Sequence, residues 1–196
     1  MRDIHLKNSL FDVRLAQLKD VACLADILTT SFYCDDKGRF ARLKQWLQPL
    51  IRWGISLDLN HRLTDDSTRY ACLVADRLDR PARAIATVEM GMRYVPQIGR
   101  GISLLDWQAS QFPYLFNLAV HPQWRRQGAA MQLLSSAEQM AARWGFQQLY
   151  LHVLENNLPA RQLYQEFGYQ FYKVEPGLRF WLDSKPRRLL LRKVIN

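Results

Sequence analysis

The chain has 196 residues, of which 48% are hydrophobic and 23% are charged, and its formal net charge is +9. This length is enough for one domain with a full core, and the composition is that of a globular protein with a packed interior rather than a disordered one. No apolar run approaches the roughly 20 residues that cross a bilayer, and the charged start at Arg2 and Asp3 lacks the apolar core of a signal peptide. We therefore expect a single domain over residues 1–196, without a membrane partner, that is cytoplasmic or soluble in an organelle such as a plastid.

The positive charge allows a nucleic-acid partner, but it is dispersed, and no recognition-helix or RNA-binding motif accompanies it. A polyanionic cofactor or an acidic substrate also accounts for it. The cysteines Cys23, Cys34 and Cys72 form no Cys-x-x-Cys pair, and the histidines show no metal-ligand spacing. We therefore expect a reducing compartment, no metal and no nucleic acid.

The first half of the chain runs from a strand through two helices to further strands. Phe11–Leu15 alternates apolar and polar residues, as a strand does. Leu18–Phe32 and Phe40–Trp53 carry apolar residues at helical spacing, and Pro49 predicts a bend or break in the second helix. The strands predicted next are Tyr70–Ala75 and Ala82–Tyr94.

The second half begins after a long connection at Val95–Phe112, whose length is typical of a functional or mobile segment. The apolar strand Tyr114–Val120 precedes the clearest helix, which follows Gly128, carries one apolar stripe and ends at Gly145. This order predicts an α/β protein with a mixed sheet. The remaining predicted elements are strand Leu149–Leu154, helix Pro159–Phe167 and the strand pair Tyr169–Val174 and Arg188–Val194.

The turn between strand Tyr114–Val120 and the helix after Gly128 has the character of an anion site. Backbone N–H groups converge at a helix start, and the helix dipole favours negative charge there. Arg125 and Arg126 add positive charge, and Arg125, Gly128 and Ala130 make an Arg-x-x-Gly-x-Ala pattern. So short a pattern also occurs in ordinary strand-to-helix turns with surface arginines. The turn alone therefore does not identify a phosphate site.

A second motif begins at Asn157 and reads Asn-x-x-Ala-x-x-Leu-Tyr-x-x-x-Gly-Tyr as far as Tyr169. Together with the earlier Arg-x-x-Gly-x-Ala pattern, it resembles the GNAT superfamily of N-acetyltransferases. The resemblance extends in element order over residues 11–194 and is strongest over residues 114–172. It implies the GNAT fold, an α/β protein with a mixed, mostly antiparallel, twisted sheet flanked by helices.

The resemblance also implies that the chain binds acetyl-CoA as acyl donor. The backbone of Leu118, Ala119 and Val120 is expected to pair with the pantetheine arm, and Asn157 to hydrogen-bond that arm. Tyr164 is expected to protonate the departing thiolate, although a core tyrosine, like a simple helix cap at Asn157, is the structural alternative. The residues expected to wrap the pyrophosphate with main-chain N–H groups are Arg125, Arg126, Gln127, Gly128, Ala129 and Ala130.

Attack on a thioester needs a neutral amine, so a base or a water relay has to take up a proton. Three residues are candidates: Glu89, at a strand position where many family members place a catalytic glutamate, His152, whose imidazole titrates in the right range, and Tyr114. Tyr114 and His152 resemble, by motif register, the tyrosine and histidine that hold the base water in one class of protein N-terminal acetyltransferases. The structural alternatives are a packed tyrosine or histidine and a glutamate that faces solvent.

The stretch Pro113–Pro122, which reads Pro-Tyr-Leu-Phe-Asn-Leu-Ala-Val-His-Pro, resembles plastid and cyanobacterial GNAT enzymes. Together with the Tyr114 and His152 resemblance, it favours a protein acceptor, either an N-terminal α-amine or a lysine ε-amine. The Val95–Phe112 segment is a candidate wall of the acceptor cleft, and Asp106 is its single acidic residue, which disfavours a polyamine site. A small-molecule amine acetyltransferase and a non-catalytic acyl-CoA-binding regulatory module remain as alternatives. The sequence leaves open whether the protein is a monomer or a homodimer.

Overall fold

The computed structural model describes residues 10–33, 41–65, 69–95, 111–175 and 186–195. Contacts divide the chain into two compact units, so the predicted single domain stays a prediction. Unit 1 is made of Met1–Asp66, Ala71–Glu89 and Asn117–Ser136. Unit 2 is made of Ser67–Tyr70, Met90–Phe116 and Ala137–Asn196.

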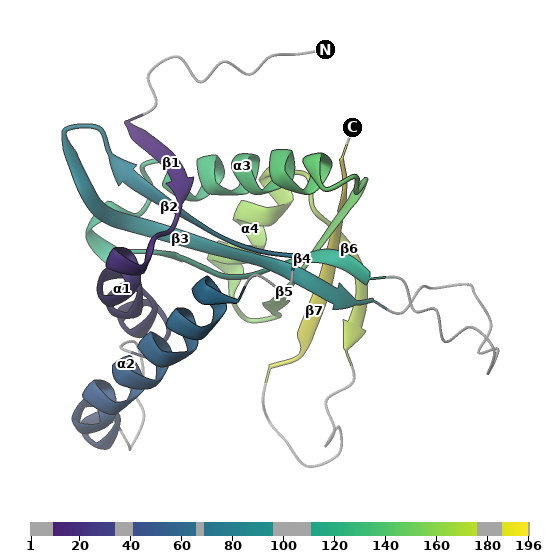
Figure 1. Cartoon of the computed structure of the whole chain (residues 1–196). Helices are drawn as coiled ribbons and strands as arrows, with labels where there is room; N and C mark the ends of the chain where they lie inside the picture. The colour runs from purple at the N-terminus through teal and green to yellow at the C-terminus, as the bar shows by residue number, and fades with distance from the viewer. Residues whose placement is uncertain (1–9, 34–40, 66–68, 96–110, 176–185, 196) are drawn as a thin grey trace. The chain divides into compact units, whose positions relative to one another are not determined.

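Within the described chain, seven strands form a sheet in the order β1-β2-β3-β4-β5-β7-β6 (Figure 1). The β4–β5 pair is parallel, whereas β1–β2, β5–β7 and β6–β7 are antiparallel. The predicted mixed α/β sheet is therefore confirmed. The strands are β1 (Phe11–Leu15), β2 (Tyr70–Arg77), β3 (Arg80–Tyr94), β4 (Gln111–Val120), β5 (Gln148–Leu154), β6 (Gln170–Glu175) and β7 (Arg188–Val194).

The helices follow the predicted order, with one clear difference in length. Helix α2 runs unbroken through Pro49 and ends at Thr64, so the predicted end at Trp53 is wrong. Its apolar spacing continues beyond Trp53 to Leu59, which is fully buried, and this burial outweighs the lost backbone donor of the proline. The helices are α1 (Val21–Tyr33) after the 3-10 turn Leu18–Asp20, α2 (Ala41–Thr64), α3 (Ala129–Arg143) and α4 (Leu158–Glu166).

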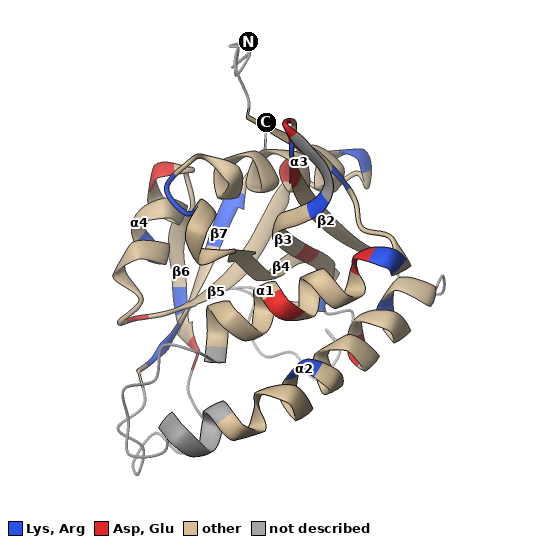
Figure 2. Cartoon of the chain, turned by 90° about the vertical axis from the view of Figure 1, so that its left-hand side faces the viewer, with Lys and Arg blue, Asp and Glu red and all other residues tan. Residues whose placement is uncertain are grey.

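In unit 1, helices α1 and α2 lie side by side (Figure 2). Arg52 of α2 lies 3.1 Å from the Asp26 carboxylate of α1, which adds an ion pair between the two helices. None of the described helices is long and apolar enough to cross a membrane.

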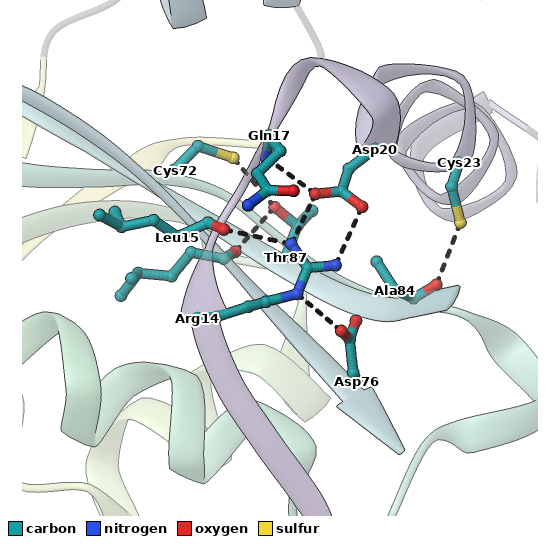
Figure 3. Close-up of polar contacts among 10 residues, drawn as sticks. Arg14, Leu15, Gln17, Asp20, Cys23, Cys72, Asp76, Ala84 and Thr87 are labelled. Carbon is teal, nitrogen blue, oxygen red and sulfur yellow. Dashed lines mark hydrogen bonds and ion pairs between the residues drawn. The ribbon is translucent and has the colours of Figure 1, made fainter. Parts of the chain in front are cut away.

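Arg14 of β1 joins the first elements of unit 1 through two carboxylates (Figure 3). Its Nε donates to Asp76 of β2 at 2.7 Å, and its terminal nitrogens donate to Asp20, at the end of the 3-10 turn, at 2.7 and 3.0 Å. Asp20 also accepts the backbone N–H of Gln17 at 2.8 Å. The chain from β1 into α1 is thereby fixed against the edge of β2.

Unit 2 is organised around β7, which pairs with β5 on one side and with β6 on the other. The register places Leu190 opposite both His152 of β5 and Lys173 of β6. Tyr114 and Tyr150, which face each other across the parallel β4–β5 pair, pack with Leu190 in a buried cluster. This cluster fixes where the side chains of β4 and β5 lie.

Candidate functional site

The turn between β4 and α3 contains two residues with left-handed backbone conformation. Arg126 has a φ of 63° and Gly128 a φ of 92°. A Cβ atom at Gly128 would meet nothing within 4 Å. The positive φ, rather than a lack of space, is therefore the reason for glycine at this position.

Gly128 directly precedes α3, and its carbonyl accepts the N–H of Gln132 at 3.1 Å. The preceding N–H groups of the first turn have no carbonyl partner within the helix, and no acidic side chain stands in that turn. Arg126 is exposed, and Arg125 Nε donates to the Val120 carbonyl at 3.2 Å, which closes the loop. The result is a cationic helix start that suits a phosphate group.

The end of β4 is held from two sides within unit 1. The Val120 carbonyl accepts a bond from Ser31 Oγ at 3.4 Å as well as the one from Arg125. The His121 N–H donates to the Ile85 carbonyl of β3 at 2.9 Å. The Val120 carbonyl is therefore already engaged, and the predicted pairing of Leu118, Ala119 and Val120 with a ligand stays a prediction.

Glu89 has no exposed surface, so the alternative of a solvent-facing glutamate is wrong. Its carboxylate forms an ion pair with Arg62 of α2 and accepts a hydrogen bond from Asn117 Nδ2 at 2.7 Å. Asn117 lies in β4 with a φ of 52°, a left-handed conformation that asparagine tolerates better than most residues. The Glu89 carboxylate thus joins α2 to an irregular point of β4, where a proton on it would weaken the Arg62 pair.

Tyr114 and His152 lie together in unit 2, as the family resemblance predicts. The Tyr114 hydroxyl is 2.5 Å from Nδ1 of His152, and the other ring nitrogen, Nε2, is 2.9 Å from Oε1 of Glu175 in β6. The Arg93 guanidinium lies over the Tyr114 ring, 4.6 Å from its centroid. Three side chains from three strands are therefore in contact, through a hydrogen bond at Nδ1 and a close carboxylate contact at Nε2.

The surroundings of His152 and Tyr114 shift the pKa of each side chain. Burial lowers the pKa of His152 below its ordinary value, against the opposing effect of the Glu175 carboxylate. Burial also raises the pKa of the Tyr114 phenol above its usual value. At neutral pH the imidazole is thus neutral and able to accept a proton, while the phenol keeps its own.

Asn157 caps helix α4, because its Oδ1 accepts the Ala160 N–H at 3.2 Å. Asn157 is therefore a helix cap, which is the structural alternative that the sequence raised. The Nδ2 group of the same side chain remains a donor. Tyr164 is 8% exposed and packs edge-on against Tyr169 at a ring distance of 5.8 Å. Burial, with a smaller effect of the Tyr114 phenol, raises the pKa of Tyr164 well above its ordinary value.

A sequence profile described as the acetyltransferase (GNAT) family matches residues 33–169. The chain belongs to this family. Two relatives of this GNAT chain are the Arabidopsis thaliana proteins GCN5-related N-acetyltransferase 4, chloroplastic, and GCN5-related N-acetyltransferase 10, chloroplastic. The first is 34% identical over 57% of this chain and 38% of its own length, the second 30% identical over 64% and 49%. Each match thus spans less than half of the relative.

Solved structures share the fold. The ribosomal-protein-S18-alanine N-acetyltransferase of Escherichia coli is 16% identical, with a TM-score of 0.61 over 95% of this GNAT chain and 94% of that one. The PaiA N-acetyltransferase of Thermoplasma acidophilum, in complex with coenzyme A, is also 16% identical, with a TM-score of 0.63 over 94% and 98%. At such identities the likeness establishes the fold, and the predicted fold class is confirmed.

Sequence reasoning missed three partners that the structure supplies for this GNAT chain. Glu175 reaches His152, while Arg62 and Asn117 bind Glu89. No local motif marks these three residues, since each contact joins different elements. Among the described residues no His, Cys, Asp and Glu gather in a group that could hold a metal ion. Asp106 and most of the predicted Val95–Phe112 segment lie outside the described residues.

Proposed function

We propose that this chain transfers an acetyl group from acetyl-CoA to a primary amine of a protein or peptide, either an N-terminal α-amine or a lysine ε-amine. The observation that carries the proposal is the contact between the Tyr114 hydroxyl and His152 Nδ1, because it provides a neutral proton acceptor at physiological pH. The N-acetyltransferase names of the relatives support the reaction class, and their chloroplastic names support the plastid alternative for its location.

The donor is bound through groups that fit its phosphates. The main-chain N–H groups from Arg126 to Ala130 hold the pyrophosphate, and the exposed Arg126 side chain adds charge. Asn157 offers its Nδ2 group to the pantetheine arm while Oδ1 stays with the helix cap. The helix start without an acidic residue supports this assignment.

The acceptor loses its proton through Tyr114 and His152. The Tyr114 hydroxyl faces the amine, directly or through one water, and passes its own proton to Nδ1 as it takes one from the nitrogen. Glu89 is the weaker candidate for this role, because both of its carboxylate oxygens are engaged by Arg62 and Asn117. We therefore assign Glu89 to holding α2 and β4 in place.

The group transfer then balances as follows. The amine nitrogen forms a bond to the acetyl carbon, and the carbon–sulfur bond breaks, with its electron pair leaving on sulfur. A second proton from nitrogen ends on sulfur by way of the Tyr164 hydroxyl, and the proton held by His152 returns to solvent. Because burial keeps the Tyr164 phenol protonated, it is available as a donor throughout the pH range of the reaction.

The proposal is tested by acetyl-CoA turnover against a mixed panel of peptides and small amines, with the acetylated nitrogen located by mass spectrometry. We expect product on peptide nitrogens, and we expect Tyr164→Phe, which keeps the ring, to lower kcat on the order of 100-fold. The turnover of Glu89→Gln is compared with that of His152→Gln, because the two residues are competing candidates for taking up the proton of the amine. Acetylation confined to small amines contradicts the acceptor class, and acetyl-CoA binding without any turnover contradicts the activity.

A further inference from the structure

The imidazole of His152 lies between two oxygen atoms from different strands. Nδ1 is 2.5 Å from the Tyr114 hydroxyl of β4, and Nε2 is 2.9 Å from Oε1 of Glu175, the last residue of β6. The His152 side chain is only 10% exposed, whereas the Glu175 side chain is 36% exposed. Nδ1 is in a hydrogen bond, whereas Nε2 has a close contact with the carboxylate that lacks hydrogen-bond geometry. The two nitrogens of the ring are therefore not equivalent.

We propose that Glu175 is a positioning residue that fixes the tautomer of His152 and thereby the direction in which the proton of the acceptor amine travels. The inference rests on the proposed function of Tyr114 and His152. A carboxylate accepts hydrogen bonds and does not donate them, so the nitrogen facing Glu175 carries the hydrogen. Nδ1 is then the acceptor, and the Tyr114 hydroxyl donates to it.

This arrangement gives each proton one route. The amine proton moves to the Tyr114 oxygen while the phenolic proton moves to Nδ1, so Tyr114 stays neutral before and after the step. The hydrogen on Nε2 remains there, facing the Glu175 carboxylate, and the imidazolium that forms lies beside that carboxylate. The positive charge that forms on the imidazolium is therefore balanced by the neighbouring Glu175 carboxylate.

Among the groups around His152, Glu175 is the one whose effect favours the protonated imidazole. Arg93 of β3 and Arg188 of β7 both disfavour an imidazolium, and burial does so more strongly. Tyr114 of β4 is neutral, because burial raises its pKa. Glu175 of β6 is the group that opposes these effects, since its charge and its contact with Nε2 raise the pKa of His152.

The test uses Glu175→Gln in the full chain, because glutamine keeps the shape and an accepting oxygen but removes the charge. We expect the acidic limb of the kcat/KM profile to move to lower pH, because the histidine loses its stabilising carboxylate, and kcat to fall on the order of tenfold. An NMR titration of the imidazole, assigned by the signal that His152→Gln removes, should move in the same direction without any substrate. Glu166→Gln, an exposed carboxylate on α4 with the same charge change, should leave both unchanged.

The outcomes separate the two proposals. If Glu175→Gln leaves both the pH limb and the imidazole titration where they are in the unmodified protein, the positioning role is overturned. If Glu175→Gln moves the imidazole titration but His152→Gln turns over normally, the contact is supported and the proposed proton relay fails. If Glu175→Gln only unfolds at a lower temperature and its pH profile is unchanged, the inference is also overturned. Glu175→Asp keeps the charge, so its acidic limb should lie closer to that of the unmodified protein.

Discussion

Arg14 shows how a single side chain fixes the start of unit 1. It donates to Asp20 and Asp76, which are 4% and 6% exposed, so both carboxylates depend on it for compensation of their lost hydration (Figure 3). The hydrogen bond from Arg14 lowers the pKa of Asp20 below its usual value, against the effect of burial. The free energy of unfolding therefore includes a contribution that needs Asp20 ionised.

We predict that Arg14→Met lowers the free energy of unfolding by about 3 kcal/mol at neutral pH, because it leaves two buried carboxylates without a cation. Urea unfolding followed by circular dichroism measures this loss. Arg187→Met is the matched control, since its partner Glu155 is exposed and the pair lies in solvent, so its effect should be much smaller. Equal losses in the two variants would contradict the role of Arg14.

The pH dependence of the free energy of unfolding, compared between the unmodified protein and Arg14→Met, gives a second measurement. Because the folded pKa of Asp20 is depressed, its stabilising contribution is fully present above the unfolded value of about 3.9 and is lost as pH falls through the folded value. We predict that the stability difference between the unmodified protein and Arg14→Met narrows as the pH falls below about 4. Unfolding curves at a series of pH values test this, and a difference that stays constant down to pH 2 contradicts it.

At the scale of elements, the start of α3 depends on backbone conformation more than on side chains. Gly128 has a φ of 92°, and a Cβ there would meet no atom, so an added methyl group acts through φ alone. Gly54 lies inside α2, where a Cβ would also meet nothing within 4 Å and the backbone is helical. The two glycines are thus a matched pair for the same substitution.

We predict opposite results for Gly128→Ala and Gly54→Ala. The first should lower stability by about 1–2 kcal/mol and raise the KM for acetyl-CoA, because the left-handed conformation is strained for alanine and the N–H groups move. The second should raise stability by about 0.5–1 kcal/mol, since alanine is the better helix former, and leave KM unchanged. Thermal unfolding and steady-state kinetics decide, and a KM that rises equally in both variants speaks against the loop assignment.

At the scale of the whole molecule, the net charge of +9 suits the proposed donor, acetyl-CoA, which carries several phosphates. Salt screens such attraction over a Debye length of about 10 Å at 0.1 M. We predict that the KM for acetyl-CoA rises with sodium chloride concentration, whereas the KM for S-acetylpantetheine, which has no phosphate, stays nearly constant. An equal salt effect on both donors would mean that the positive charge does not serve donor binding.

Much of the fold was predictable because its signals are local. The apolar stripe of α3, the turn at Gly128 and the cap at Asn157 each depend on residues within a few positions of one another. The family resemblance predicted that Tyr114 and His152 lie close to each other, although 38 residues separate them, but it did not predict their direct contact. The length of α2 was missed, because Pro49 is a strong local signal for a helix end and the buried Leu59 that overrides it acts through packing.

The sequence by itself determined the order of the elements and the GNAT motifs, and from these motifs it predicted the residues that bind a CoA donor. Only the tertiary structure decided which groups complete the ionisable centres: Glu175 at Nε2 of His152, and Arg62 with Asn117 at Glu89. For Glu175 the reason is the strand order β5-β7-β6 and its register, which bring β5 and β6 to either side of β7. Strand register arises from the burial of whole faces of the sheet, so no short stretch of sequence records it.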